Sequence, residues 1–257
     1  AVALHRSVSL ARAIGRIDLE AQPLPTLGFA LAYLGSFSDS IACYERVLSL
    51  RESLPLSADN ELLLARNLAN FGATCNGMGL LERALSLFQQ AREHFLRLGI
   101  VRDGATCLSS QAMVHVRRAE RLSRQPSADA RVQAVAAAWE VLALAEQVVA
   151  DPSTEAQDEA TVNARLSVVK AHIVLGDCAA AAEELKQIDP FLTDDAQGSR
   201  YLADRSTLRA RLLRLSGRAS EAIAELQTVP LDDLSHADRV SVLEELIATQ
   251  EAAGDLA

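Results

Sequence analysis

The stretches Leu27–Leu48 (LGFALAYLGSFSDSIACYERVL) and Phe71–Ala91 (FGATCNGMGLLERALSLFQQA) carry the same pattern. Each opens with a large apolar residue followed by Gly, and each has a second Gly seven residues after the first. An aromatic residue follows nine residues after the second Gly. The two copies lie 44 residues apart. A fixed repeat of this length is typical of proteins built from stacked structural units.

Each copy predicts two helices joined by a tight turn. Gly35 and Gly79 end the first helix, because Gly adopts the left-handed conformation that closes helices. Ile41, Tyr44 and Val47 then restart an apolar stripe at helical spacing. Gly28 and Gly72 fall inside the first helices, where Gly costs about 1 kcal/mol relative to Ala. We therefore expect a neighbouring helix to approach closely at these two positions.

The same two-helix unit, in more divergent form, can be followed along the whole chain. Gly176, Gly217 and Gly254 mark the turns of later copies, and no segment shows a strand pattern. The third copy has no terminating Gly and two long helices, interrupted near Pro126. The expected units cover residues 1–20 (the second helix of a preceding repeat), 21–55, 60–99, 102–150 (degenerate), 155–190, 200–230 and 236–257 (incomplete).

The spacing of Leu-Gly, Gly, a small residue and an aromatic residue resembles the tetratricopeptide repeat. Leu31 and Cys75 depart from that family's pattern, since they stand where it prefers Tyr. The resemblance implies an all-α fold, a single right-handed superhelical solenoid of antiparallel helix hairpins. It also implies a binding function, with the first helices of the units lining a concave groove.

Composition narrows the classes of function. The chain has 257 residues, is 49% hydrophobic and carries a net charge of −9. An acidic total argues against general nucleic-acid binding, which requires a basic face. The four Cys residues lie in apolar helical patterns without paired spacing, which indicates reduced core residues of a cytoplasmic protein. The longest uncharged run, residues 21–38, contains Pro and Gly and is a poor membrane span.

No catalytic constellation is present in the sequence. It lacks a Gly-rich phosphate loop, an HExxH motif, zinc-like Cys/His spacing and a nucleophile elbow. Adjacent acidic pairs such as Glu244-Glu245 point about 100° apart on a helix and do not converge by themselves. We therefore expect this segment to be no enzyme and to require no cofactor or metal.

Three residues whose side chains could bind a ligand or titrate are interpreted as packing residues. His115 and His172 align with the position where the repeat family keeps Tyr, so we expect a core or half-buried imidazole, with a ligand or pH-sensing role as the alternative. Trp139, on the long second helix of the third unit, is expected in the core, with a ligand platform as the alternative.

The resemblance implies which side chains point into the groove. The residue after the Leu-Gly pair, and those three and four further on, face it in this family. On this chain they run from aromatic and small residues in the first two units to basic residues in the last. The predicted partner-binding residues are Phe29, Tyr33, Asn76, Met113, Arg117, Lys170, Arg211 and Arg214. The wider set adds Ala32, Ala73, Gly77, Val116, Ile173, Val174 and Leu215.

Such a groove favours a protein or peptide partner with an apolar anchor and acidic residues. The alternative is that its cations are solvated, or paired with Asp204 and Glu251. Family members that bind chaperone tails hold a terminal carboxylate with a Lys/Asn/Arg clamp. Asn70 matches one clamp position, but Pro25 and Phe29 stand where Lys and Asn are needed. The clamp function is therefore not expected.

The family also suggests a larger context. Residues 244–257 (EELIATQEAAGDLA) resemble the last repeat before a GGDEF diguanylate cyclase domain in bacterial signalling proteins. Large LuxR-type transcription regulators share the architecture. We expect a non-catalytic, regulatory protein-interaction module of a larger bacterial signalling protein. The alternatives are a small-molecule or peptide sensor controlling a transcription regulator, and an oligomerisation module, with a homodimer in which the apolar ends of the array or Trp139 are buried.

Overall fold

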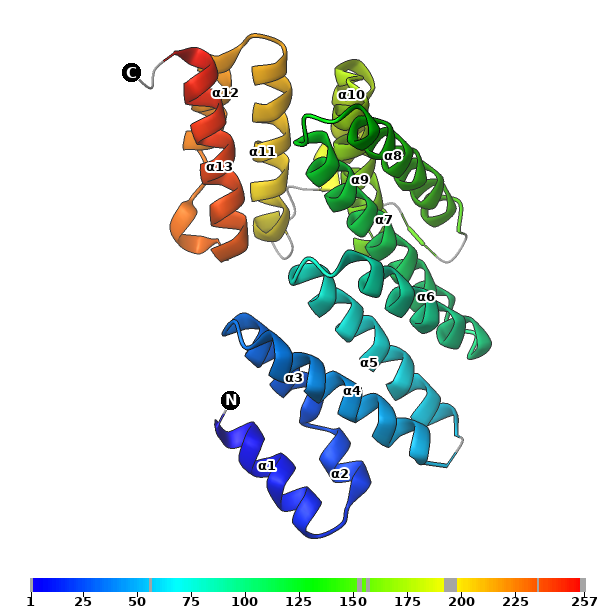
Figure 1. Ribbon diagram of the computed structural model, residues 1–257. Coiled ribbons are helices and arrows are strands. Elements are labelled where there is room, and N and C mark those ends of the chain that lie inside the picture. The colour runs from blue at the N-terminus through cyan, green and yellow to red at the C-terminus, as the bar shows by residue number, and fades with distance from the viewer. Residues whose placement is uncertain are drawn as a thin grey trace. The chain divides into compact units, whose positions relative to one another are not determined.

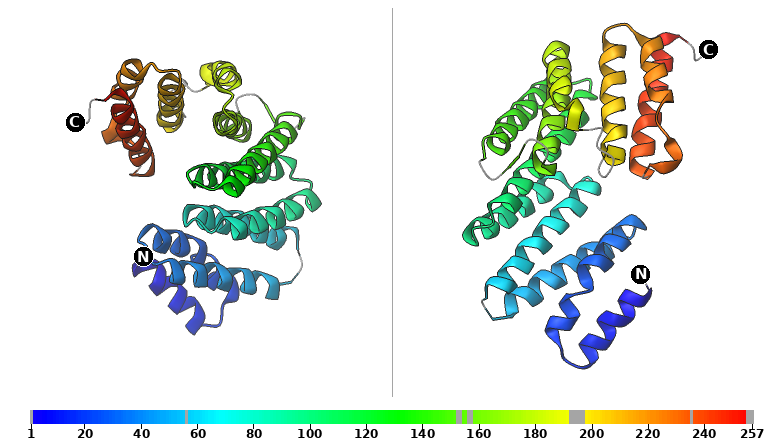
Figure 2. Two further views of the ribbon diagram at one scale, coloured as in Figure 1. Left: turned by 45° about the horizontal axis from the view of Figure 1, so that its top comes forward. Right: turned by 180° about the vertical axis from the view of Figure 1, so that it is seen from behind.

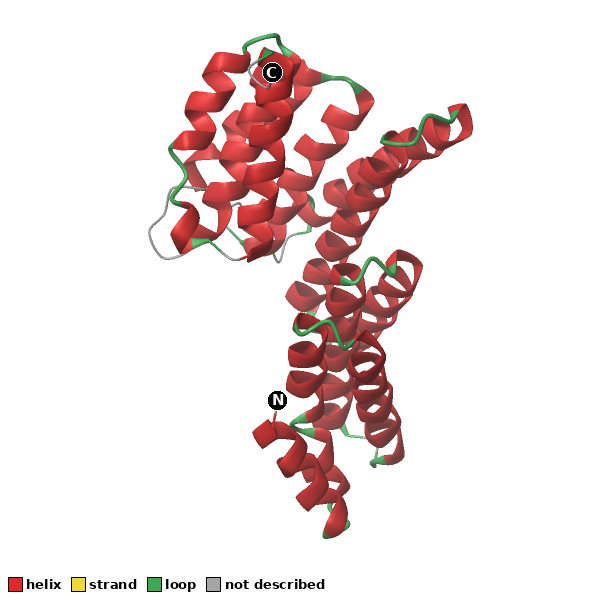
Figure 3. Ribbon diagram, turned by 60° about the vertical axis from the view of Figure 1, so that its left-hand side comes forward, coloured by secondary structure: helices red, strands yellow, loops and turns green. Residues whose placement is uncertain are grey.

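A computed structural model describes residues 2–55, 57–151, 154–155, 158–191, 198–234 and 236–254. Over these ranges the secondary structure is helical without strands (Figure 3), which confirms the all-α prediction. The chain divides into two compact units. Figure 1 labels the helices of both. Unit 1 comprises residues 1–114 and 150–154, and unit 2 comprises residues 115–149 and 155–257.

Unit 1 contains six helices and the first part of a seventh. Their bounds are α1 Val2–Ala13, α2 Ile17–Ala21, α3 Leu24–Tyr33, α4 Phe37–Ser53, α5 Ala58–Gly77, α6 Leu81–Arg97 and α7 Val101–Ser123. Consecutive helices α3 and α4, and α5 and α6, pack against each other across short turns (Figure 2). Helix α5 also packs against α3 and α4. The helices therefore form two hairpins whose first helices are neighbours.

Unit 2 contains the end of α7 and the remaining helices. Their bounds are α8 Ala128–Val149, α9 Glu159–Leu175, α10 Cys178–Ile188, α11 Gly198–Leu215, α12 Ala219–Gln227 and α13 His236–Ala253, with short 3-10 helices η1 Asp189–Phe191 and η2 Leu231–Asp233. Helix α9 packs against α8 and α10, and α11 packs against α12 and α13. The first helices α9, α11 and α13 also contact one another in sequence order.

The repeated glycines have the two roles that the sequence predicts. Gly35 and Gly79 have φ values of +80° and +77°, the left-handed conformation that ends α3 and α5. The later turns at Gly176, Gly217 and Gly254 share this conformation. A Cβ atom on Gly28 would lie 2.8 Å from Cε2 of Tyr44, and one on Gly72 would lie 3.1 Å from the Phe88 ring. Both close approaches are confirmed, and each joins the two helices of one hairpin.

The N-terminal helix differs from the prediction. One helix was expected over residues 1–20, but α1 ends at Ala13 and the short α2 begins at Ile17. Gly15, with φ of +68°, makes the intervening turn. Glu20 of α2 is buried and accepts hydrogen bonds from Arg12 of α1 and Arg46 of α4. The carboxylate of Glu20 therefore links the short helix α2 to both α1 and α4.

The core of unit 1 is built around two stacked aromatic rings. The rings of Tyr44 and Phe71 lie 4.8 Å apart between centroids and are nearly parallel, and both residues are 1% exposed. The Arg83 guanidinium lies 4.7 Å from the Phe71 ring centroid, on the ring face. Helices α4, α5 and α6 therefore meet at one aromatic residue, Phe71.

Trp139 is not a core residue, contrary to the prediction, because its side chain is 60% exposed. The buried face of α8 consists of Ala130, Ala134, Ala137, Ala138, Val141, Ala145 and Val148. Small residues allow α9 to approach closely, and they turn the large Trp139 ring outward. In the described part of the chain, α8 alone is long and apolar enough to span a membrane by composition. Its alanine-rich face is buried, and α8 packs against α9.

The four cysteines are free, and they differ in accessibility. Cys75 and Cys107 are buried, and burial raises the pKa of their thiols to about 11 and about 12. Cys43 and Cys178 are half-buried. We expect Cys43 and Cys178 to react with an aromatic disulfide reagent at pH 8, and Cys75 and Cys107 to react only in denaturant, since the thiolate is the nucleophile. Rapid labelling of all four thiols in the folded protein would contradict this packing.

Candidate binding groove

A hollow of about 610 Å³ lies between α3 and α5 of unit 1. We call it the α3–α5 hollow. No charged residue is among the twelve that line it: Pro25, Thr26, Phe29, Ala32, Tyr33, Phe37, Tyr44, Asn70, Ala73, Thr74, Gly77 and Met78. Its volume falls within the usual range of ligand pockets, about 300–1,000 Å³.

The rim of the hollow is aromatic and exposed. Phe29 and Tyr33 are four residues apart on α3 and therefore share one face of that helix. Phe37 is the first residue of α4, and the turn at Gly35 brings it to the same side. The three side chains are 62%, 78% and 50% exposed, in a chain with six Phe, three Tyr and one Trp. Exposed aromatic rings around a hollow are typical of a binding surface.

The floor of the hollow carries a few polar groups. The buried Tyr44 hydroxyl hydrogen-bonds with the Thr74 hydroxyl, at 3.0 Å, and Thr74 also donates to the main-chain oxygen of Asn70 at 2.8 Å. Burial raises the pKa of Tyr44, so the phenol is neutral at physiological pH. The Asn70 side chain and Thr26 add polar groups to the lining. The site thus combines apolar walls with uncharged hydrogen-bonding groups.

The structure brings part of the predicted set together. Phe29, Tyr33, Ala32, Ala73 and Gly77 all line the α3–α5 hollow. Asn76 is buried and does not belong to the lining. Met113 and Arg117 are exposed on α7, in unit 1 and unit 2 respectively.

The sequence did not single out Phe37 and Thr74 for this site. Phe37 follows the turn directly, outside the repeat positions that the resemblance uses. Thr74 lies one turn beyond Asn70 on the same face of α5, so its spacing from Asn70 carries the signal that could have found it. Tyr44 was interpreted as a packing residue, and it both packs in the core and lines the hollow.

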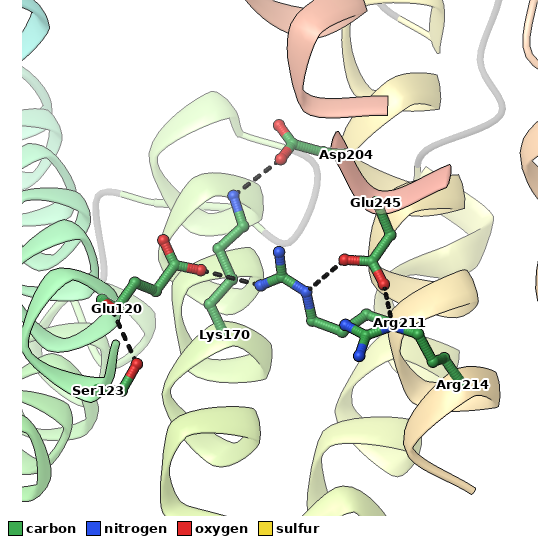
Figure 4. A network of polar contacts seen from close by, with 7 residues as sticks. All are labelled: Glu120, Ser123, Lys170, Asp204, Arg211, Arg214 and Glu245. Carbon is green, nitrogen blue, oxygen red and sulfur yellow. Dashed lines mark hydrogen bonds and ion pairs between the residues drawn. The ribbon is translucent and has the colours of Figure 1, made fainter. Parts of the chain in front are cut away.

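Three of the four predicted basic residues of unit 2, Lys170, Arg211 and Arg214, form ion pairs (Figure 4). Lys170 of α9 lies 2.8 Å from Asp204 of α11. Glu245 of α13 is 3% exposed, and its two carboxylate oxygens accept from the Nε atoms of Arg211 and Arg214, at 2.9 and 2.8 Å. The alternative interpretation, that these cations are paired, holds for all three, with Glu245 in place of Glu251.

Arg211 lies between two carboxylates. Its Nη1 atom is 3.0 Å from Glu120 of α7, on the other side from Glu245 (Figure 4). Burial lowers the pKa of Arg211, but the charges of Glu120 and Glu245 more than offset this, and the pKa is raised overall. The guanidinium is therefore fixed in its charged form and bound within the protein.

The histidines and acidic side chains of the described residues form no metal-binding cluster. His115 and His172 are half-buried, as expected. Within the described ranges, no three His, Cys, Asp or Glu side chains lie close enough together to hold a metal ion.

No family model matches the sequence, and no curated protein is similar to it. Among solved structures, the fold is similar to that in the crystal structure of BtubC (BKLC) from P. vanneervenii. The TM-score is 0.56 with 15% sequence identity, over 89% of this chain and 87% of that chain. At this identity the similarity shows a shared helical fold and carries nothing about function.

Proposed function

We propose that this chain is a non-catalytic binding module built from tetratricopeptide-type hairpins, and that the α3–α5 hollow binds an apolar side chain of a protein or peptide partner. The observation that carries the proposal is the exposed rim of Phe29, Tyr33 and Phe37 around an uncharged hollow. The first helices of successive hairpins contribute Phe29, Tyr33 and Thr74 from the same side. In the tetratricopeptide family, which the repeat pattern resembles, the first helices of the hairpins line the partner-binding groove.

The ion pairs restrict the proposed partner. Acidic residues were expected because Lys170, Arg211 and Arg214 appeared available, but each is paired with a carboxylate. The α3–α5 hollow itself offers no cation. An apolar anchor held by aromatic contacts, with hydrogen bonds between the Asn70 side chain and the partner's main chain, therefore fits the site better than an acidic motif.

Selection from a random peptide library displayed on phage tests the proposal. We expect the selected peptides to share an apolar residue and to bind the double variant Phe29→Ala/Tyr33→Ala at least about tenfold more weakly, because truncated aromatic anchors typically cost more than 1 kcal/mol. Leu34→Ala is the matched control, since Leu34 is also exposed but does not line the hollow. Binding should depend little on salt.

The same selection can contradict the proposal. Peptides whose affinity is unchanged by the double variant would place binding elsewhere. Enrichment of acidic peptides whose binding is lost in high salt would instead indicate a binding site at the cations of unit 2.

A second candidate function is the binding of a small apolar ligand, which the size of the hollow would accommodate. Fragment binding that the double variant abolishes, without any selected peptide, would favour it.

The role within a larger signalling protein depends on the resemblance of residues 244–257 alone. Reading the parent gene beyond Ala257 tests it. A GGDEF-like domain there would make the module the regulatory part of a cyclic-dinucleotide enzyme. A helix-turn-helix would make it the sensor of a transcription regulator.

A further inference from the structure

Helix α8 exposes an apolar stripe on the side away from its packed face. Val132 and Trp139 are 70% and 60% exposed, and Val135 is also exposed. With the half-buried Leu142, these residues follow spacings of three, four and three, so they form one line along the helix. The alanine-rich face holds α8 in unit 2. Val132 and Val135 of the stripe also line a hollow with Val174 and Leu175 at the end of α9. We call it the α8 stripe.

The α8 stripe is centred on the helix and flanked by opposite charges. Helix α8 runs from Ala128 to Val149, so Trp139 lies at its middle. Arg131 and Glu146 lie near its two ends, at equal distances from the midpoint, and both are exposed. Neither forms an ion pair with another residue of the described ranges. Arg131 and Glu146 therefore exchange places when the helix is reversed, while Asp129 and Glu140 are two further exposed charges of α8.

This pattern is self-complementary. If two α8 helices pack antiparallel about a two-fold axis near Trp139, Arg131 of each copy approaches Glu146 of the other, and the pair forms twice. A parallel arrangement would bring like charges together. A membrane surface is less suitable, because interfacial helices carry several basic residues beside the apolar face, whereas this chain has a net charge of −9.

We propose that the α8 stripe binds a second copy of this chain, with the two α8 helices antiparallel and Trp139 at the centre of the contact. A helix of this length extends about 33 Å. Contact along one helix pair falls at the low end of the area of stable interfaces, about 1,200 Å² in total. The structure therefore predicts a homodimer with a dissociation constant in the micromolar range.

Trp139 is the single Trp of the chain and reports on the contact directly. Sedimentation of the full chain from about 1 to 200 µM should show a monomer–dimer equilibrium, and Trp emission should move to shorter wavelength over the same range. Trp139→Ala should weaken the dimer at least about tenfold, as for a central aromatic residue of an interface. Leu34→Ala, which removes another exposed apolar side chain outside both the α8 stripe and the α3–α5 hollow, is the control and should leave the dimer unchanged.

Charge exchange tests the antiparallel arrangement. Arg131→Glu and Glu146→Arg should each weaken the homodimer, because each brings two like-charged pairs together. An equimolar mixture of the two variants should recover the wild-type affinity as a heterodimer, since both pairs then have opposite charges. Circular dichroism of each variant confirms that it is folded.

Four results would overturn the proposal. A wild-type chain that stays monomeric at the highest concentration would exclude the dimer. Self-association unaffected by Trp139→Ala would place the contact elsewhere, for example at the exposed apolar residues of α1 or α13. Failure of the mixed variants to recover affinity would exclude the antiparallel pairing. Binding of the stripe to lipid vesicles by a chain that does not self-associate would assign it to a membrane surface instead.

Discussion

Glu245→Ala is expected to destabilise unit 2 by about 3–5 kcal/mol, the usual cost of removing one partner from a buried ion pair. Glu245 is 3% exposed and accepts one hydrogen bond from each of Arg211 and Arg214. Its removal leaves two neighbouring guanidinium groups, each about one quarter exposed, without the carboxylate between them. Helix α13 would also lose its ionic link to α11.

Urea unfolding followed by circular dichroism measures this effect. Glu221→Ala is the matched control, because Glu221 forms an exposed pair with Arg218 on the same turn of α12. That change should cost less than about 1 kcal/mol. Equal losses of stability for the two variants would show that the Glu245 network does not stabilise unit 2.

Gly28→Ala is expected to lower the stability of unit 1 by about 2 kcal/mol, the middle of the range for an overpacked core. This loss of stability is the opposite of what helix propensity predicts, since propensity favours Ala over Gly by about 1 kcal/mol. The new Cβ would lie 2.8 and 2.9 Å from two atoms of the Tyr44 ring. That ring is held by its stack on Phe71 and cannot move without disturbing it.

Gly77→Ala provides the comparison within the same unit. Gly77 is the last residue of α5, and no atom lies within 4 Å of the position of its missing Cβ. Helix propensity alone then determines whether the variant is more or less stable than the wild type. We expect a gain in stability of roughly 0.5 kcal/mol. In thermal unfolding, the Tm of Gly28→Ala should lie below that of the wild type, and the Tm of Gly77→Ala should lie above it. A Gly28→Ala variant as stable as Gly77→Ala would mean that the hairpin can open at Tyr44.

The repeat pattern predicted the local features that depend on backbone conformation. The turns at Gly35 and Gly79 and the contact between Gly28 and Tyr44 follow from what Gly alone can do, so they could be inferred from spacing. The prediction of one helix over residues 1–20 was wrong because Gly15 lies outside the aligned repeat positions. Its turn depends on Glu20, whose two arginine partners come from different helices.

The position of Trp139 could not be predicted because α8 is apolar on nearly every side. In such a helix the pattern does not say which face is buried, and here the smallest residues take that face. The partner of Arg211 and Arg214 depends on the register of α13 against α11, which no spacing within either helix fixes. The hollow was partly predicted because residues four apart on one helix share a face, whereas its floor needed the packing of α3, α4 and α5 together.

Tyr44 has a consequence for how binding specificity could change. Its ring belongs to the core, beside Gly28 and Phe71, while the same residue lines the floor of the α3–α5 hollow. A substitution that reshapes the floor therefore disturbs the fold of the hairpin as well. Phe29, Tyr33 and Phe37 lie at the exposed rim, so substituting them does not disturb the core of the hairpin. If the α3–α5 hollow binds a partner as proposed, divergent copies of this chain could acquire new partners by mutating the rim, while the floor stays constant under selection for folding.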